Sequence, residues 1–136
     1  MARKLLDTTF LIHYWAGTPA VEDYLDEHEQ TTEFVTTPIN LKEIVVGRTF
    51  QGKFDQTEIR STFEWVEIIP FEAEHAFHAG ALEADLRNND EHNQDKLNSL
   101  TADLLIAAVA KALDIPVVTR NTDDFELFDG LNVETY

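Results

Sequence analysis

The stretch TADLLIAAVAKALDIPVVT at 101–119 decides the fold of this chain. The segment 104–110 within it is apolar without a break, which predicts a central, buried helix over 102–113 with Thr101 as its cap. The segment 115–119 that follows is rich in β-branched residues and predicts a strand. A buried helix that leads directly into a buried strand is typical of a parallel α/β sheet.

The same alternation of strands and helices extends over the rest of the chain. Short apolar or β-branched runs predict further strands at 4–6, 34–36, 66–69 and 131–134. Helical spacing and end signals predict helices at 10–16 (capped by Thr8 or Thr9), 20–29, 39–50, 55–63 (capped by Asp55) and 72–86, with a short one before the last strand. The polar stretch 87–99 has no periodicity, and we expect a solvent loop there. The predicted fold is a three-layer α/β/α sandwich around a central, mainly parallel sheet of about five strands.

Length and composition narrow the class of protein. A chain of 136 residues is expected to form a single domain over 1–136. The absence of cysteine excludes disulfides and thiolate metal sites. No apolar run approaches the ~20 residues of a membrane-spanning helix, and no signal peptide is recognisable. We therefore expect a soluble, cytoplasmic protein with no membrane partner.

The charge balance is strongly acidic. The chain has 26 Asp and Glu against 10 Lys and Arg, a formal net charge of −16. Nucleic-acid binders normally gain phosphate affinity from basic residues, so the balance indicates either another kind of partner or an acidic surface laid over an ordinary fold. Halophilic cytoplasmic proteins have such surfaces, because at molar salt the screening length is roughly 3 Å. We favour a halophilic origin, since the acids are spread along the chain.

Four acids fall where a parallel α/β sheet places its ligands, beyond the carboxyl ends of the strands. Asp7 ends the first predicted strand, and Asp103 opens the buried helix. Asp124 follows the strand that ends at Thr119, and Glu43 lies on the helix after the strand 34–36. Taken alone, each has a simpler explanation, such as a favourable helix dipole, an exposed helical position or a turn. Taken together, clustered carboxylates need a counter-ion, and Mg²⁺ prefers oxygen ligands of this kind.

Four segments of the chain resemble the PIN-domain family, and within it the VapC-type toxin ribonucleases. They are LLDTTFLIHYW at 5–15, TTPINLKEIVVG at 36–47, TADLLIAAVAKALDIPVVTRNTDDFELFDGL at 101–131 and VETY at 133–136. In order and at this spacing, the segments extend the resemblance over nearly the whole chain.

The resemblance implies a Mg²⁺-dependent endoribonuclease, with Mn²⁺ as a substitute, in which a metal-activated water hydrolyses RNA. It implies that Asp7 and Asp103 hold the metal directly, and that Glu43 and Asp124 act directly or through waters; Asp123 is the less favoured neighbour. It further implies supporting or phosphate-contacting roles for the residues Thr8, Thr119, Arg120 and Asn121. The implied partners are transfer or ribosomal RNA as substrate, a VapB-type antitoxin and a second copy of the chain in a homodimer.

Two departures from the family pattern are visible. His13 stands where relatives often have Asp, and the polar stretch 88–99 is longer than expected. No catalytic role is assigned to His13, nor to the remaining histidines His28, His75, His78 and His92. The basic residues Lys42 and Arg48 are further candidates for phosphate contact, with a solvated surface role as the alternative.

Other classes of function are weaker fits. A Mg²⁺-dependent phosphatase would have a second Asp at position 9, which is Thr, and a receiver domain would have paired acids after the first strand. An RNA-processing nuclease without an antitoxin shares the predicted site and remains open. So does a PIN-like binding module without activity.

Overall fold

A computed structural model of the protein describes residues 1–89 and 93–136. Its strands are β1 (Ala2–Leu6), β2 (Thr32–Thr36), β3 (Glu67–Ile68), β4 (Val117–Val118) and β5 (Val133–Glu134). They form a five-stranded sheet in the order β3-β2-β1-β4-β5, with every neighbouring pair parallel. The predicted parallel α/β sheet is therefore confirmed.

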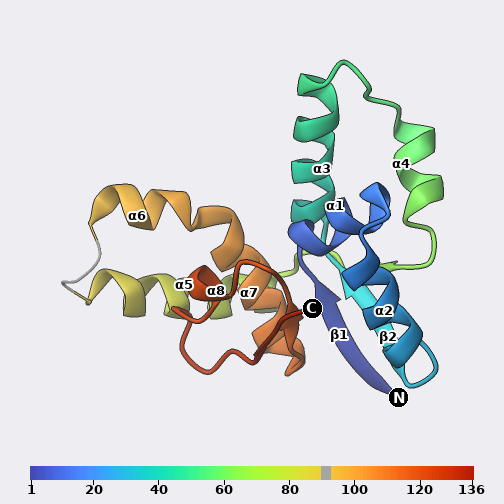
Figure 1. Ribbon diagram of the computed structural model, residues 1–136. Coiled ribbons are helices and arrows are strands. Elements are labelled where there is room, and N and C mark those ends of the chain that lie inside the picture. Colours follow the sequence, from blue (N-terminus) through green and yellow to red (C-terminus); the bar gives the residue numbers. More distant parts are fainter. Residues whose placement is uncertain (90–92) are drawn as a thin grey trace.

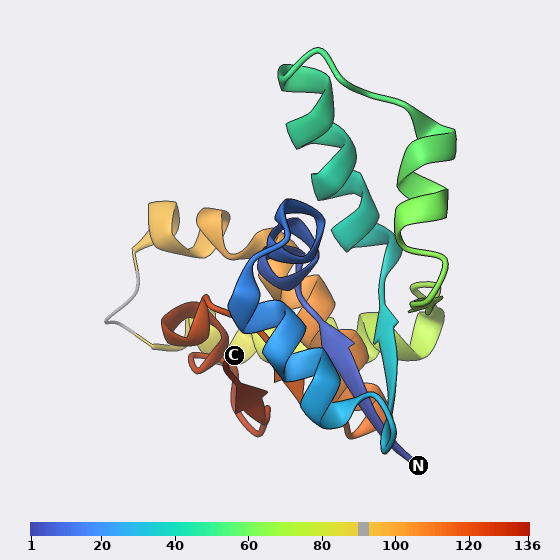
Figure 2. The ribbon, with the colours of Figure 1, turned by 45° about the vertical axis from the view of Figure 1, so that its right-hand side comes forward.

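The helices cover both faces of this sheet (Figures 1 and 2). They are α1 (Thr8–Ala16), α2 (Pro19–His28), α3 (Pro38–Phe50), α4 (Gln56–Thr62), α5 (Ala73–Arg87), α6 (Gln94–Ser99), α7 (Thr101–Leu113) and α8 (Thr122–Phe125). Helices α5 and α7 pack on one face, and α1 and α2 pack on the other. Helices α3 and α4 extend beyond the sheet as an arm.

Two apolar cores result from the alternation of side chains along the strands. In β1, Leu5 belongs to the core under α5 and α7, and its neighbour Leu6 belongs to the core under α1 and α2. Val117 and Val118 of β4 divide between the two cores in the same way. Because successive strand residues point to opposite faces, an unbroken apolar strand requires cover on both sides. This is the physical basis of the three predicted layers.

Helix α7 has the buried position that its composition predicts. Its residues 106–110 are all buried between α5 and the sheet. The helix ends at Asp114 in the left-handed conformation, with φ of 55°, and the Ile115 N–H then donates to the carbonyl of Ala110. Aspartate tolerates this conformation better than most residues, so the chain can turn sharply into β4.

Two predicted helix caps are wrong. Thr8 is the first residue of α1 and Asp7 is the N-cap, without a capping bond from its side chain, while the Thr8 hydroxyl donates to Glu43. Thr101 is likewise the first residue of α7, and its hydroxyl donates to the carbonyl of Asn98. In both cases the threonine hydroxyl donates a hydrogen bond to another residue instead of capping its own helix, as local sequence rules would predict. The predicted cap of α4 is confirmed, because Asp55 accepts from the N–H of Glu58.

The loop predicted at 87–99 is wrong in part, because residues 94–99 form α6. The Asn93 side chain caps this helix by accepting from the N–H of Lys96, and Leu97 packs against the core of α5 and α7. One cap and one apolar contact hold α6 in place. Its six residues are too few to show helical periodicity in the sequence. Residues 90–92 of the predicted loop, with His92, lie outside the described residues.

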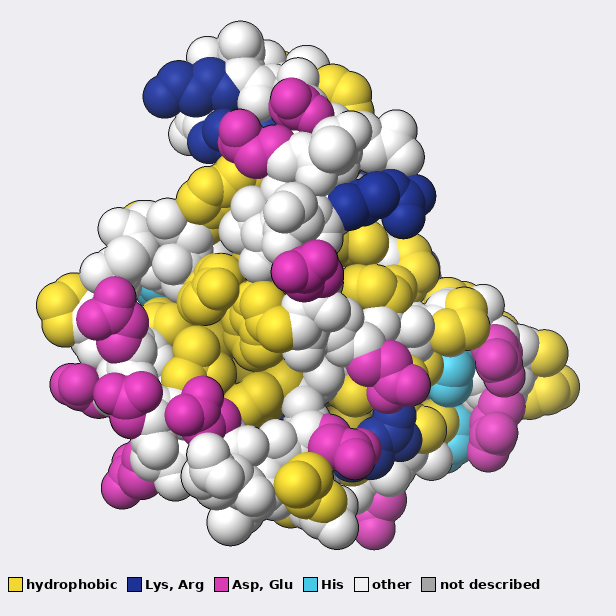
Figure 3. Space-filling model, turned by 90° about the vertical axis from the view of Figure 1, so that its right-hand side faces the viewer, with side chains coloured by type: hydrophobic (Ala, Val, Ile, Leu, Met, Phe, Trp, Pro, Cys, Tyr) yellow, Lys and Arg dark blue, Asp and Glu magenta, His cyan; other side chains and the backbone are white. Residues whose placement is uncertain are grey.

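Figure 3 shows hydrophobic side chains gathered on one face of the molecule with acidic side chains around them. An apolar hollow of about 480 Å³ opens between α3 and α4, lined by residues that include Val45, Phe54 and Ile59. In the part of the chain that the structure describes, no helix combines the length and the apolar character needed to cross a membrane.

Candidate active site

The predicted site lies where the strand order of the sheet reverses. From β1 the chain first builds outward to β2 and β3, and later returns to place β4 on the other side of β1. Ligands of open parallel sheets bind beyond the carboxyl ends of the strands at such a point. Asp7 follows β1 directly and Thr119 follows β4 directly, so both stand at this edge.

Asp7 is held in a fixed orientation by hydroxyl groups. Its side chain is 3% exposed. Its Oδ2 accepts from the Thr119 hydroxyl at 2.8 Å and from the Thr9 hydroxyl at 3.3 Å. Burial raises the pKa of Asp7, the Thr119 hydroxyl opposes that rise, and the negative charge of Glu43 adds to it. The two hydroxyl groups therefore orient the Asp7 carboxyl group, and that of Thr119 also opposes the rise in its pKa.

Glu43 is tied to the same edge through a relay of buried polar groups. The Thr8 hydroxyl donates to Glu43 Oε1 at 2.6 Å and accepts from Asn40 Nδ2 at 3.0 Å. Asn40 Oδ1 accepts in turn from the N–H and the hydroxyl of Thr37, at 3.1 and 2.7 Å. The relay runs from α3 to the first residue of α1. It therefore fixes Glu43 against the start of α1, just beyond the end of β1.

Asn40 and Thr37 are site-building residues to which the sequence analysis gave no role. Both are fully buried, and together they form a capping box at the start of α3. The available signal was the spacing Thr37-Pro38-Ile39-Asn40, which is typical of a helix start, with the asparagine three residues before Glu43.

Asp103 lies in the first turn of α7, half-buried, and it shows that the four acids form one electrostatic cluster. Burial raises the pKa of Asp103 to about 7, and the charges of Asp7, Glu43 and Asp124 add to the rise. Its Oδ2 accepts one long hydrogen bond, from Asn121 Nδ2 at 3.3 Å. The neighbouring carboxylates therefore add to the effect of burial in disfavouring the charged form of Asp103.

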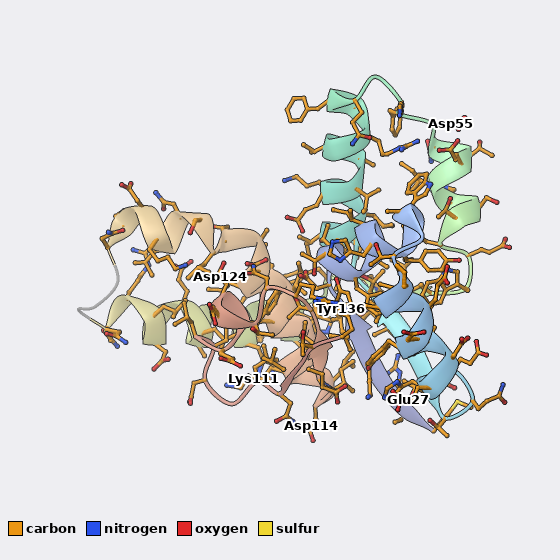
Figure 4. All side chains as sticks on the ribbon, in the orientation of Figure 1. Glu27, Asp55, Lys111, Asp114, Asp124 and Tyr136 are labelled. Carbon is orange, nitrogen blue, oxygen red and sulfur yellow. The ribbon has the colours of Figure 1, made fainter. Side chains whose placement is uncertain are left out.

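Asp124 differs from the other acids because it has a cationic partner. Lys96 Nζ donates to Asp124 Oδ1 at 2.6 Å, and this bond holds the pKa of Asp124 below its usual value against the opposing effect of partial burial. Figure 4 labels Asp124 on α8. The neighbouring Asp123 is exposed, so the side chain that turns toward the cluster is Asp124, the one favoured by the sequence.

The supporting residues predicted after β4 also lie at this edge. The Asn121 N–H donates to the Thr119 hydroxyl at 2.9 Å, and the Arg120 N–H donates to the Thr9 hydroxyl at 3.2 Å. The guanidinium of Arg120 lies over the ring of Tyr136, labelled in Figure 4, at 4.4 Å from its centroid. The loop after β4 is therefore tied to the start of α1.

The candidate Arg48 and two of the histidines without an assigned role make contacts away from the acids, and the candidate Lys42 is exposed. Arg48 pairs with Glu58 at 2.8 Å and lies over the ring of Trp15, so it is directed away from the acids. His13 Nδ1 lies 2.6 Å from the hydroxyl of Tyr136, in an aromatic contact beside α1. The buried His75 accepts from the N–H of Glu72 at the start of α5. Lys42 is exposed on α3.

The acid cluster fits a hard divalent cation by its donor set. All four side chains offer carboxylate oxygens, and the charges of Asp7, Glu43 and Asp124 add to the rise in the pKa of Asp103 that burial causes, a repulsion that such a cation would relieve. Among the described residues, no three carboxylate or imidazole groups converge as a ready-made cage. Mg²⁺ commonly takes only one or two carboxylates directly and keeps several waters, so a wider arrangement suits it.

Comparisons with known proteins extend these observations. A family model described as PIN domain matches residues 4–131. No curated protein sequence matches the chain. Among solved structures, VapBC2 from Rickettsia felis, bound to a DNA fragment from its promoter, is 22% identical with a TM-score of 0.80 over 98% of each chain.

Two further complexes are similar in fold. The DNA-bound VapBC from Salmonella typhimurium is 19% identical with a TM-score of 0.77, over 99% of this chain and 98% of the other. VapBC-5 from Mycobacterium tuberculosis, a member of a family of toxin–antitoxin systems, is 26% identical with a TM-score of 0.62 over the same shares of the two chains.

Proposed function

The chain belongs to the PIN-domain family, and on that premise we propose that it is a metal-dependent endoribonuclease and the toxin of a type II pair of the VapBC kind. One observation carries the catalytic part. Four carboxylates form a single electrostatic cluster at the carboxyl edge of the sheet, where burial and, after it, the charges of Asp7, Glu43 and Asp124 raise the pKa of Asp103 to about 7. A cluster of this kind suits a divalent cation and phosphodiester chemistry.

In the proposed mechanism the chain's own residues prepare the site. Asp7 and Asp103 would hold Mg²⁺ directly, and Glu43 and Asp124 directly or through waters. The bound ion would supply a water of lowered pKa and offset the charge on the phosphate. The Thr119 hydroxyl orients Asp7 and the Thr8 hydroxyl orients Glu43, so neither carboxylate must reorganise when substrate arrives.

Arg120 is the candidate for binding the RNA phosphate. It is exposed beside the cluster, and its stacking on Tyr136 limits the conformations of a long side chain. A guanidinium held in this way can donate two hydrogen bonds to one phosphate. Lys42, the residue before Glu43 on α3, is exposed and is a second candidate.

The proposed partner is a protein antitoxin, which the resemblance to toxin–antitoxin complexes supports. Transfer or ribosomal RNA as substrate, and a homodimeric toxin, belong to the same proposal. The alternative is an RNA-processing nuclease with the same acid cluster and no antitoxin. A small adjacent reading frame encoding a DNA-binding protein would favour the toxin, and its absence would favour the alternative.

The net charge of −16 predicts how activity should depend on salt. A polyanionic substrate is repelled by such a protein at low ionic strength, and molar salt reduces the screening length to roughly 3 Å. We therefore propose that activity rises with KCl, as in a halophilic cytosol. Activity that falls steadily as KCl is added would contradict this part of the proposal.

The experiment is cleavage of total RNA in molar KCl with Mg²⁺, Mn²⁺ or EDTA. We expect discrete fragments that disappear with EDTA. Asp7→Asn and Asp103→Asn should each lower the rate by at least about a hundredfold, the upper end of what outer-shell partners of a metal contribute. The matched control is Asp26→Asn, because Asp26 lies on α2 beside Thr32, at the opposite, amino-terminal edge of the sheet.

Each result bears on a different part of the proposal. A well-folded wild-type protein that cleaves no RNA with either metal would contradict the nuclease and favour a binding module. Cleavage that persists in EDTA, or that Asp26→Asn lowers as much as Asp7→Asn does, would contradict the assignment of the acid cluster.

A further inference from the structure

A lysine lies against the acid cluster. Lys96, on α6, donates from Nζ to Asp124 Oδ1 at 2.6 Å. Within residues 1–89 and 93–136, this is the single ion pair that Lys or Arg makes with any of the four acids. The two side chains are 40% and 28% exposed, so the pair stands at the mouth of the cluster rather than in the core.

The fold places Lys96 there through several contacts around it. The Asn93 side chain caps α6 at the N–H of Lys96, and the Ser99 hydroxyl donates to the carbonyl of Lys96 at 2.6 Å. The neighbouring Leu97 packs against the core of α5 and α7. The backbone of Lys96 is therefore anchored on both sides, and its side chain spans from α6 to α8.

The ammonium acts on more than its bonded partner. Besides binding Asp124, its positive charge opposes the rise in the pKa of Asp103. Lys96 thus partly offsets the repulsion among the carboxylates. A divalent cation bound there would offset the same repulsion. A resident ammonium and an incoming metal ion compete for the same negative charge.

We propose that Lys96 is the resident counter-ion of the acid cluster: it occupies Asp124 until a divalent cation displaces it, and it thereby sets the metal affinity of the site. This inference rests on the proposed function, because it takes the cluster to be the metal site. It assigns a role to α6, which lies in the polar stretch that departs from the family pattern.

The proposal makes two opposite expectations for a variant without the ammonium. In metal-free protein, Lys96→Met should lower the melting temperature, because Asp124 loses its partner and the repulsion increases. In the same variant Mn²⁺ should bind about three- to tenfold more tightly, the range set by losing competition from a partly exposed ion pair. Lys96→Arg keeps the charge and should bind Mn²⁺ within about twofold of wild type.

The test measures Mn²⁺ binding by titration calorimetry and by the electron paramagnetic resonance of free Mn²⁺. The charge-matched control is Lys53→Met, which should leave Mn²⁺ affinity unchanged, since Lys53 is exposed between α3 and α4 and forms no ion pair among the described residues. Lys96→Met should also be tested in an Asp124→Asn background, where the proposal expects no further gain. A gain that persists there would show a general effect of net charge and overturn the proposal.

The remaining outcomes are equally decisive. Unchanged or weaker Mn²⁺ binding by Lys96→Met overturns the proposal and leaves the nuclease untouched, because RNA cleavage tests the nuclease separately. A wild-type protein that binds no Mn²⁺ by either method overturns both. Lys96→Gln is a second variant that removes the charge and retains a polar group, and it should reproduce the gain in affinity if Lys96→Met folds poorly.

Discussion

The two halves of the acid site are built differently. In the buried half, short hydrogen bonds from Thr119 and Thr8 hold Asp7 and Glu43, and the fully buried Asn40 supports Thr8 from behind. In the open half, Asp103 has one amide bond of 3.3 Å and Asp124 has a lysine.

In this site, the groups that orient the carboxylates differ from the group that balances their charge. Neutral hydroxyl and amide groups can orient a carboxylate without cancelling its charge, and when buried and fully paired they also rigidify the structure around it. In the open half, burial and then the charges of the neighbouring acids raise the pKa of Asp103, and Lys96, a partly exposed cation, opposes that rise. One half thus presets geometry, and the other presents charge that a ligand can neutralise.

The largest effect on stability is expected in the buried half. Asn40→Ala removes the partner of the Thr37 N–H, the Thr37 hydroxyl and the Thr8 hydroxyl at once. Leaving buried polar groups unpaired should lower the free energy of unfolding by about 2–4 kcal/mol. Urea denaturation of the metal-free protein measures this change.

The matched control is Asn98→Ala, because Asn98 is an exposed amide on α6 whose side chain accepts from Gln94. It should change the free energy of unfolding by less than about 0.5 kcal/mol. If Asn40→Ala costs no more than this control does, the buried half is not held by its polar relay and the contrast between the halves is lost.

An effect of opposite sign is expected in the open half. Asp103→Asn removes a carboxylate whose charged form is disfavoured by burial and then by its acidic neighbours, so it should raise the free energy of unfolding in EDTA at pH 8 by about 1–2 kcal/mol, allowing for the water that reaches this half-buried group. The pKa of Asp103 is about 7 in the folded protein, against a usual value of 3.8, so the charged form destabilises the fold fully above pH 7.

The control for this prediction is how the stability difference between Asp103→Asn and the wild type depends on pH. As pH falls from 7 towards 4, the folded protein takes up the proton and the advantage of Asp103→Asn should shrink. Mg²⁺ should stabilise the wild type more than the variant. An Asp103→Asn protein that is less stable than wild type in EDTA at pH 8 would show that the open half is not under repulsion.

The smallest effect is expected at the link between α1 and α3. Thr8→Val deletes the hydroxyl that donates to Glu43, and should lower the free energy of unfolding by about 1 kcal/mol. RNA cleavage should fall about tenfold, as when an outer-shell partner of a metal ligand is removed. Thr8→Ser keeps the hydroxyl and should restore most of the rate; equal losses in both variants would indicate a packing effect instead.

Much of the fold could be predicted because it depends on local patterns. The unbroken apolar run of α7 and the β-branched residues of β4 each specify burial from their own sequence. Helix α6 could not be predicted in this way, because its six residues offer too few positions for a periodic pattern, and its Leu97 packs against a core formed by distant parts of the chain. The predicted cap at Thr8 is wrong because its hydroxyl donates to Glu43, 35 positions away, whereas Thr101 donates to the carbonyl of Asn98 in the preceding helix.

The sequence by itself determined which acids stand near strand and helix ends. The strands that precede Asp7 and Asp124, and the helix that Asp103 opens, can be recognised from their own apolar residues. Only the tertiary structure decided how those acids are held. The bond between Thr8 and Glu43 spans 35 positions, and that between Lys96 and Asp124 spans 28. Such contacts depend on which strand ends meet at one edge of the sheet, and strand order is set by the packing of the whole chain rather than by any local pattern.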